Sequence, residues 1–147
     1  MQRYPNQAIQ ELHNQLLHVE NIINHMPESN VIMYLNRVMA RLFFIETGLT
    51  NINNNNNNSK TVHSFIRIID STFNLTIFIE DLINNIFEVN RDHLTFEEIN
   101  PTQNIDIAIN EIRYYGSSFE FPYYQDISNH IFDTINELYR IYQMIYR

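Results

Sequence analysis

The sequence predicts an all-α protein, a single-domain bundle of four long helices and one shorter helix. Apolar residues recur at the three-to-four-residue spacing of helices along most of the chain, and the stretch 61–89 confines its polar residues to one side of a helix. A chain of 147 residues is also a common size for one domain, here 1–147. The expected elements are long helices near 7–26, 30–47, 61–89 and 123–146, and a shorter helix near 103–115.

The stretch 61–89 is predicted to be the central helix of this bundle. Its polar residues fall within one arc of roughly 100° on a helical projection. They are Arg67, Asp70, Ser71, Asn74, Asp81, Asn85 and Glu88. The other positions are almost all apolar, so this helix is expected to be buried on several sides, with Thr61 as its N-cap. Alternation between Phe73 and Ile79 is typical of a strand, but the stretch is far longer than the usual ~5–6-residue strand, which favours a helix.

The first two predicted helices have clear limits and regular apolar stripes. Residues 7–26 repeat apolar positions at alternating three- and four-residue intervals, which predicts packing along a neighbour at a shallow angle. These positions are Ile9, Leu12, Leu16, Val19, Ile23 and Met26. Pro27 ends this helix, and Ser29 or Asn30 can cap the next one. Gly48 suits the left-handed position after a helix, so the second helix is expected to end at 47.

Two segments are predicted to connect helices. Residues 49–60 contain the run Asn53–Asn58, which has no apolar face to bury, so this segment is expected to be a flexible Asn-rich loop. Residues 114–124 contain six aromatic residues and Gly116, which is expected to end the shorter helix. Aromatic side chains carry much of the apolar area of a contact. This second segment is therefore either a lid over the end of the bundle or an anchor for another chain.

The side of helix 30–47 that lies opposite its core stripe is too apolar for a solvent face. Cover by another helix is the favoured interpretation. The alternative is a partner surface, because Met, Phe and Arg are enriched where interfaces bury side chains. Together with the aromatic segment, this side supplies the candidate partner-binding residues: Met33, Arg37, Arg41, Phe44, Tyr114, Tyr115, Phe119, Phe121, Tyr123 and Tyr124.

Composition excludes several classes of protein. Cysteine is absent, which excludes disulfide scaffolds and cysteine-ligated metal sites. A formal net charge of −8 argues against general nucleic-acid binding. No run approaches the ~18 apolar residues of a membrane span, and no signal-peptide pattern is present, so an intracellular protein (cytoplasmic, nuclear or virion-associated) is expected. Asn, Ile, Tyr and Phe, which have AT-rich codons, are abundant, and this favours an AT-rich genome such as that of a large DNA virus.

No sequence pattern indicates catalysis or a bound ion. Two glycines are too few for a phosphate-binding loop, and His18 and His25 lie about 10 Å apart on one helix face, too far to share a metal ion. We therefore expect no catalytic residue, cofactor, metal or small-molecule substrate. Glu80 lies in the apolar sector of the central helix, and a buried carboxylate must be paired or protonated. A structural ion pair between Glu80 and Arg41 is predicted, with Arg37 as the other candidate partner.

The leading functional hypothesis is a non-enzymatic interaction or structural assembly protein that binds another protein or a second copy of itself. A set of residues in the second predicted helix suggests an alternative: Asn36, Phe43, Phe44 and Gly48. This set resembles the first homology motif of the B-cell-lymphoma family of apoptosis regulators, without that family's Gly-Arg pair. The resemblance implies a helical groove that binds amphipathic peptide helices. The acidic balance allows a third hypothesis, an inhibitor or immunity-type protein that covers a basic target.

Overall fold

A computed structural model of the chain describes residues 3–55, 59–86, 101–116 and 121–146. Within these residues every regular element is helical, as predicted. The elements are α1 Pro5–Asn24, α2 Asn30–Asn55, the short 3-10 turn η1 Ser59–Thr61, α3 Val62–Ile86, α4 Pro101–Tyr115 and α5 Phe121–Ile145. Four of these α-helices have 20 to 26 residues and α4 has 15, so the prediction of four long helices and one shorter helix is confirmed.

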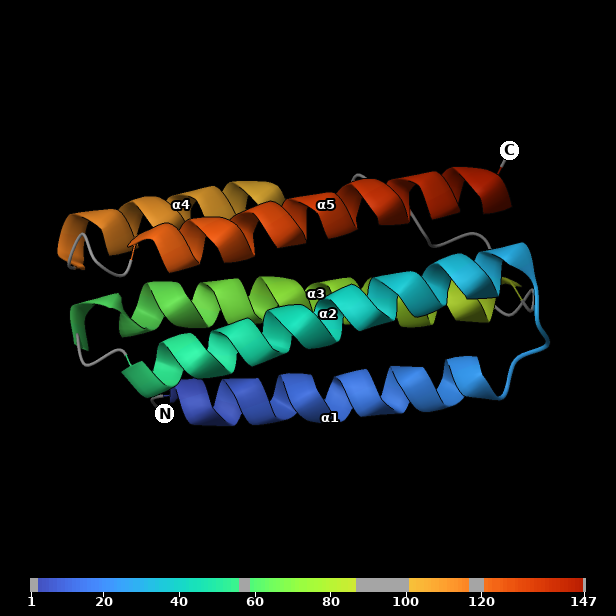
Figure 1. Ribbon diagram of the computed structural model, residues 1–147, viewed down its shortest axis with the longest axis horizontal. Coiled ribbons are helices and arrows are strands. Elements are labelled where there is room, and N and C mark those ends of the chain that lie inside the picture. The colour runs from blue at the N-terminus through green and yellow to red at the C-terminus, as the bar shows by residue number, and fades with distance from the viewer. Residues whose placement is uncertain (1–2, 56–58, 87–100, 117–120, 147) are drawn as a thin grey trace.

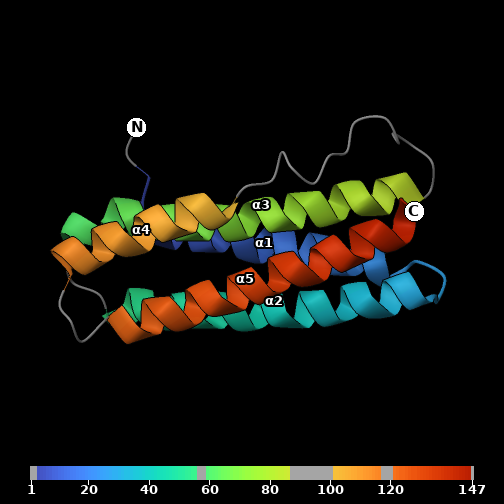
Figure 2. The same cartoon turned by 90° about the horizontal axis from the view of Figure 1, so that it is seen from above.

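The helices form one bundle in which consecutive helices run antiparallel (Figures 1 and 2). α1 lies against both α2 and α3. On the side of the bundle opposite α1, α5 packs on α2, α4 packs on α3, and α4 and α5 also touch. α3 contacts each of the other four helices, so it is the central helix that the sequence predicts.

The core is built from the apolar stripes that the sequence shows. On α1 the stripe from Ile9 to Ile23 is buried, and on α5 Ile131 and Leu138 are buried. Burying each such aliphatic side chain contributes about 1.5–3 kcal/mol to folding. The start of α2 is fixed by Ser29, whose Oγ accepts a hydrogen bond from the Ile32 N–H at 3.2 Å, as a helix cap does.

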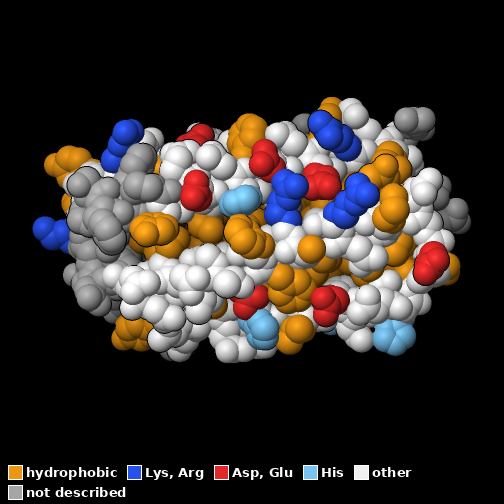
Figure 3. Space-filling model, in the orientation of Figure 1, with side chains coloured by type: hydrophobic (Ala, Val, Ile, Leu, Met, Phe, Trp, Pro, Cys, Tyr) orange, Lys and Arg blue, Asp and Glu red, His pale blue; other side chains and the backbone are white. Residues whose placement is uncertain are grey.

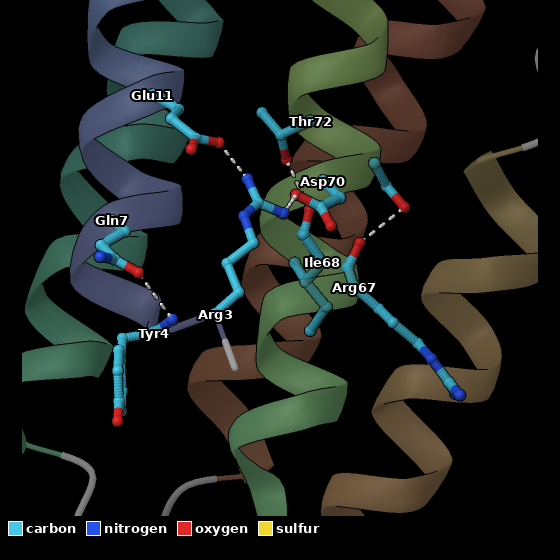
Figure 4. Close-up of polar contacts among 9 residues, drawn as sticks. Arg3, Tyr4, Gln7, Glu11, Arg67, Ile68, Asp70 and Thr72 are labelled. Atoms are coloured by element: carbon cyan, nitrogen blue, oxygen red, sulfur yellow. Dashed lines mark hydrogen bonds and ion pairs between the residues drawn. The ribbon is translucent and has the colours of Figure 1, made fainter. Parts of the chain in front are cut away.

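Arg3 ties α1 to α3 through two carboxylates (Figure 4). It lies just before α1, and its guanidinium donates to Glu11 on α1 and to Asp70 on α3. Asp70 belongs to the predicted polar arc of α3. This part of the arc therefore faces the N-terminal segment, and it is only partly open to solvent.

A second polar tie joins α3 to α4. The hydroxyl of Ser64, which is buried, and the guanidinium of Arg67 both donate to Glu111 on α4. The Ser64 hydrogen bond and, after it, the Arg67 pair hold the pKa of Glu111 below its usual range, against the opposing effect of burial. Ion pairs and hydrogen bonds with neighbouring segments therefore use Arg67 and Asp70 of the arc, while the side chain of Asn74 is exposed.

The predicted Asn-rich loop 49–60 is wrong over 49–55, because α2 continues to Asn55. Leu49 and Ile52 are buried and extend the core stripe of α2 by two further steps of three to four residues. Their burial outweighs the weak helix propensity of Asn, about 0.7 kcal/mol per residue relative to Ala. Residues 59–61 form η1, and 56–58 lie outside the described residues.

Gly48 lies inside α2, so the predicted end of this helix at 47 is also wrong. A Cβ atom at Gly48 would lie 2.5 Å from Cδ1 of Ile127 on α5, closer than two carbon atoms can approach. The absence of a side chain therefore lets Ile127 reach the backbone of α2. The role of this glycine is close helix packing, a long-range property that turn statistics do not describe.

The predicted aromatic loop 114–124 is helical at both ends, since α4 runs to Tyr115 and α5 begins at Phe121. Tyr124 is 0% exposed and packs edge-on against Phe65 of α3, with ring centroids 5.9 Å apart. Tyr124 therefore belongs to the core. Its prediction as a partner-binding residue is wrong because the first turn of α5 points it inward.

Candidate functional site

The predicted partner-binding residues of α2 lie on its outer side, beside α5. Met33, Arg37 and Phe44 are exposed, whereas Arg41 is half-buried. α5 packs next to them and contacts Arg41 through a carboxylate, but it leaves the other three side chains accessible. Cover of this side by another helix, which the sequence favoured, is therefore only partial.

The predicted aromatic residues separate into two groups. Tyr123 is exposed on the first turn of α5 and, like Phe44, lines a groove described below. Tyr114 and Tyr115 are exposed at the end of α4, where their rings contact each other with centroids 4.8 Å apart, and they do not line that groove. The predictions for Phe119 and for the side chain of Phe121 fall outside the described residues.

The groove lies between the second half of α2 and the first half of α5 and holds a cavity of about 580 Å³. This volume is within the range of about 300–1,000 Å³ that binding pockets usually have. Each wall is one face of a helix, because the lining positions on each helix repeat every three or four residues. The lining residues are Phe44, Gly48, Asn51, Ile52 and Asn55 from α2, and Tyr123, Asp126, Ile127 and His130 from α5.

The middle of the groove is apolar, and an exposed aromatic side chain lies at each of its two ends. Gly48 and Ile127 meet at its centre, where Ile127 takes the place of the side chain that the glycine lacks. Phe44 is 59% exposed and touches the ring of His130 edge-on, with centroids 4.9 Å apart. Tyr123 is 56% exposed at the other end. Two large rings therefore lie on helices with much of their surface in contact with water.

The charge of the groove is negative. Asp126 is exposed and makes no hydrogen bond or ion pair with other described residues. Further along α5, Arg41 of α2 lies between two carboxylates, 3.8 Å from Asp133 and 3.5 Å from Glu137. One positive charge thus faces two negative charges there. Figure 3 shows this side of the molecule, where hydrophobic side chains run across the middle and charged side chains border them.

Two ionisable side chains of the groove lie on one face of α5. Asp126 and His130 lie one helical turn apart, but the His130 ring packs against Phe44. None of the nine described lining residues is a serine, threonine, cysteine or lysine, but Tyr123, Asp126 and His130 are of types that can form covalent intermediates. The groove offers a ligand apolar area, two asparagine amides, one carboxylate, one imidazole and one phenol.

Glu80 does not pair with Arg41, so that prediction is wrong. Glu80 faces α1, where it accepts a hydrogen bond from Gln15 Nε2 at 2.9 Å and contacts His18 Nε2 at 3.1 Å. Its side chain is only half-buried. The helical projection placed Glu80 correctly toward a neighbouring helix, but the projection of one helix does not say which neighbour packs there.

Sequence reasoning missed most of the lining residues. Asn51, Ile52 and Asn55 were hidden in the predicted loop, and the apolar periodicity that continues from Ile45 to Leu49 and Ile52 is the signal that would have placed them on a helix. Asp126 and His130 of α5 have no local signal. Their role depends on the contact between α2 and α5, which no local pattern encodes.

Comparison with known proteins finds no matching protein family, no similar curated protein and no similar solved structure. The function therefore has to be argued from the residues themselves. Among the described residues, no helix is long and apolar enough to cross a bilayer. In the same part of the chain, no three His, Asp or Glu side chains are placed to share a metal ion.

Proposed function

We propose that this protein is a non-enzymatic interaction protein, and that the groove between α2 and α5 is its binding surface. The observation that carries this proposal is the exposure of two aromatic side chains, Phe44 and Tyr123, at opposite ends of one cavity. Large aromatic residues supply most of the energy in protein interfaces, and burying a Phe side chain is worth about 1.5–3 kcal/mol. Both rings sit on rigid helices, so binding would order little additional structure.

The proposal is tested with a photoreactive phenylalanine analogue placed at one exposed position at a time. Position 44 tests the groove. Position 132 is the matched control, because Phe132 is also an exposed Phe (49%, against 59% for Phe44) but lies on the side of α5 that faces α4. Each variant is irradiated in extracts of the cells that produce the protein, and the crosslinked species are separated by mass.

A species crosslinked from position 44 and absent from position 132 supports the proposal. A mass of twice 17.7 kDa would identify the partner as a second copy, and any other mass a different chain. Light scattering over a concentration series provides an independent measure of self-association. Equal crosslinking from both positions, or none from position 44, would contradict the proposal.

Two alternatives suggested by the sequence stay proposals. A groove that binds amphipathic helices is supported by the cavity between α2 and α5, and the partner's chemistry is considered below. An acidic inhibitor is supported less, because only part of the −8 charge lies along the groove. An intracellular location and a viral source belong to the same proposal, and fractionation of the producing cells would test the location.

A further inference from the structure

We infer that the groove between α2 and α5 accepts an amphipathic helical segment of a partner protein that carries a Lys or Arg beside Asp126 and an apolar side chain between Phe44 and Tyr123. This inference rests on the proposed function and specifies its partner. The observations behind it are the cavity of about 580 Å³, the negative charge around this cavity, and the helical walls, which present side chains to a ligand.

The charge of the groove selects a basic partner. None of the described lining residues is a Lys or Arg, and Asp126 has no ion-pair partner among the described residues. Further along the contact between α2 and α5, the single guanidinium of Arg41 faces the carboxylates of Asp133 and Glu137. A basic segment gains from all three carboxylates and is steered toward them, whereas an acidic segment is repelled.

The walls of the groove favour a helix as the bound segment. Both walls are α-helices, so neither offers along its length the row of unpaired N–H and C=O groups that an extended strand needs, although the last turn of α2 and the first turn of α5 leave some backbone groups without a partner inside the helix. Recognition must therefore use side chains. From Phe44 to Asn55 the α2 wall rises about 16 Å, the length of three helical turns, and the ridge of a helix fits the furrow between two others.

A second copy of this chain is a poorer occupant. Each copy carries a net charge of −8, so two grooves brought together would add like charges around Asp126, Asp133 and Glu137. The cavity could instead hold a small molecule of drug size. The test below separates these occupants from a basic helix.

The probes are two synthetic helical peptides of about 18 residues with the same apolar face of Leu and one Trp, and with a polar face of either Lys or Glu. The protein contains no tryptophan, so Trp emission reports only the peptide. We expect the Lys peptide to bind wild-type protein at least about tenfold more tightly than the Glu peptide. Phe44→Ala should weaken the Lys peptide about tenfold, and Asp126→Asn about threefold.

The control variants are Phe132→Ala and Asp106→Asn. Both residues are exposed and line a hollow of only about 10 Å³ between α4 and α5, so they reproduce the residue types of the groove without its cavity. We expect both variants to bind the Lys peptide within about twofold of wild type. Circular dichroism of each variant shows whether it is folded before binding is compared.

Every other outcome overturns the inference. Equal weakening by the groove and control variants would mean nonspecific attraction to an acidic surface. An Asp126→Asn variant that binds as wild type would remove the charge requirement. No binding of either peptide, together with a crosslink from position 44, would show that the groove has a different occupant and would leave the proposed function standing. No binding and no crosslink would reject both.

Discussion

The contact of α5 with α2 and its contact with α4 contain the same kinds of residue, but only the first contains a sizeable cavity. Toward α2, Phe44 and Asp126 border a cavity of about 580 Å³, whereas toward α4, Phe132 and Asp106 border a hollow of about 10 Å³. Phe44 and Phe132 are also similarly exposed, at 59% and 49%. Exposure of an aromatic ring is therefore not what distinguishes the candidate site.

The difference comes from the small and polar residues at the helix contact. On the α4 side, Ile105 and Ile135 fill the space between the helices, as close-packed interiors require. On the α2 side, Ile127 packs down on the backbone of Gly48, and Asn51 and Asn55 beside it are short and polar. A ring beside open space can receive a partner on several sides, which is what a strong contact at an interface needs.

The largest expected effect separates two neighbouring residues of α5. Tyr124→Ala removes a ring that is 0% exposed and packs on Phe65, so we expect a loss of about 3–5 kcal/mol in the free energy of unfolding. Tyr123→Ala, on the groove, should cost less than about 1 kcal/mol. Urea unfolding followed by circular dichroism measures both. Similar losses would mean that the rim of the groove is part of the core, and the contrast between the two positions would fail.

A second prediction concerns the contact that shapes the groove. Gly48→Val places a branched side chain where Ile127 Cδ1 lies 2.5 Å from the would-be Cβ, so it should destabilise the protein by about 1–3 kcal/mol. Ile127→Ala should cost about 2–5 kcal/mol alone, because Ile127 is buried. If the two side chains compete for one space, the double variant should be at least about 1 kcal/mol more stable than the sum of the single effects predicts. Additive losses would disprove the close approach.

The fold class could be predicted from the sequence because the periodic spacing of apolar residues, which indicates a helix, is a local pattern. The stripe from Ile9 to Ile23 and the polar arc around Asp70 repeat with the period of a helix, and both were placed correctly. The end of α2 was misplaced because composition was given more weight than periodicity. The run of asparagines outweighed two apolar residues, Leu49 and Ile52, whose burial decides the structure.

The candidate site was predictable only in part. Phe44 and Tyr123 were identified as partner-binding residues from residue type alone, and the structure places them on one groove. The sequence predicts a turn at Gly48 and gives no signal at Asp126 and His130, because the importance of these residues depends on the packing of α2 against α5. The single-helix projection of Glu80 failed for the same reason, since α1, and not α2, lies on that side of α3.

A third prediction concerns the contact between α3 and α4, where Ser64 and Arg67 bind the carboxylate of Glu111. Glu111→Gln should cost about 1 kcal/mol at pH 7, because Ser64 and Arg67 both donate to the carboxylate. The pKa of Glu111 is lowered in the folded state, so its contribution is fully present above the unfolded pKa of about 4.3 and is lost as the pH falls through the folded pKa. Urea unfolding at pH 7 and at pH 3 should show the difference between wild type and variant shrinking at the lower pH. A difference independent of pH would exclude this linkage.

The smallest expected effect tests whether α2, which forms one wall of the groove, continues as a helix to Asn55. Asn51→Ala replaces an exposed residue of α2, and Ala exceeds Asn in helix propensity by about 0.7 kcal/mol, so the variant should be more stable by several tenths of a kcal/mol. In a mobile loop the same substitution would leave the free energy of unfolding unchanged, because no helix would gain from it. Asn51→Gly is the opposing control and should destabilise the protein by about 0.3 kcal/mol. Asn51→Ala should act in the same direction on thermal unfolding, and a loss of stability in this variant would mean that the asparagine amide makes a contact in the groove that outweighs propensity.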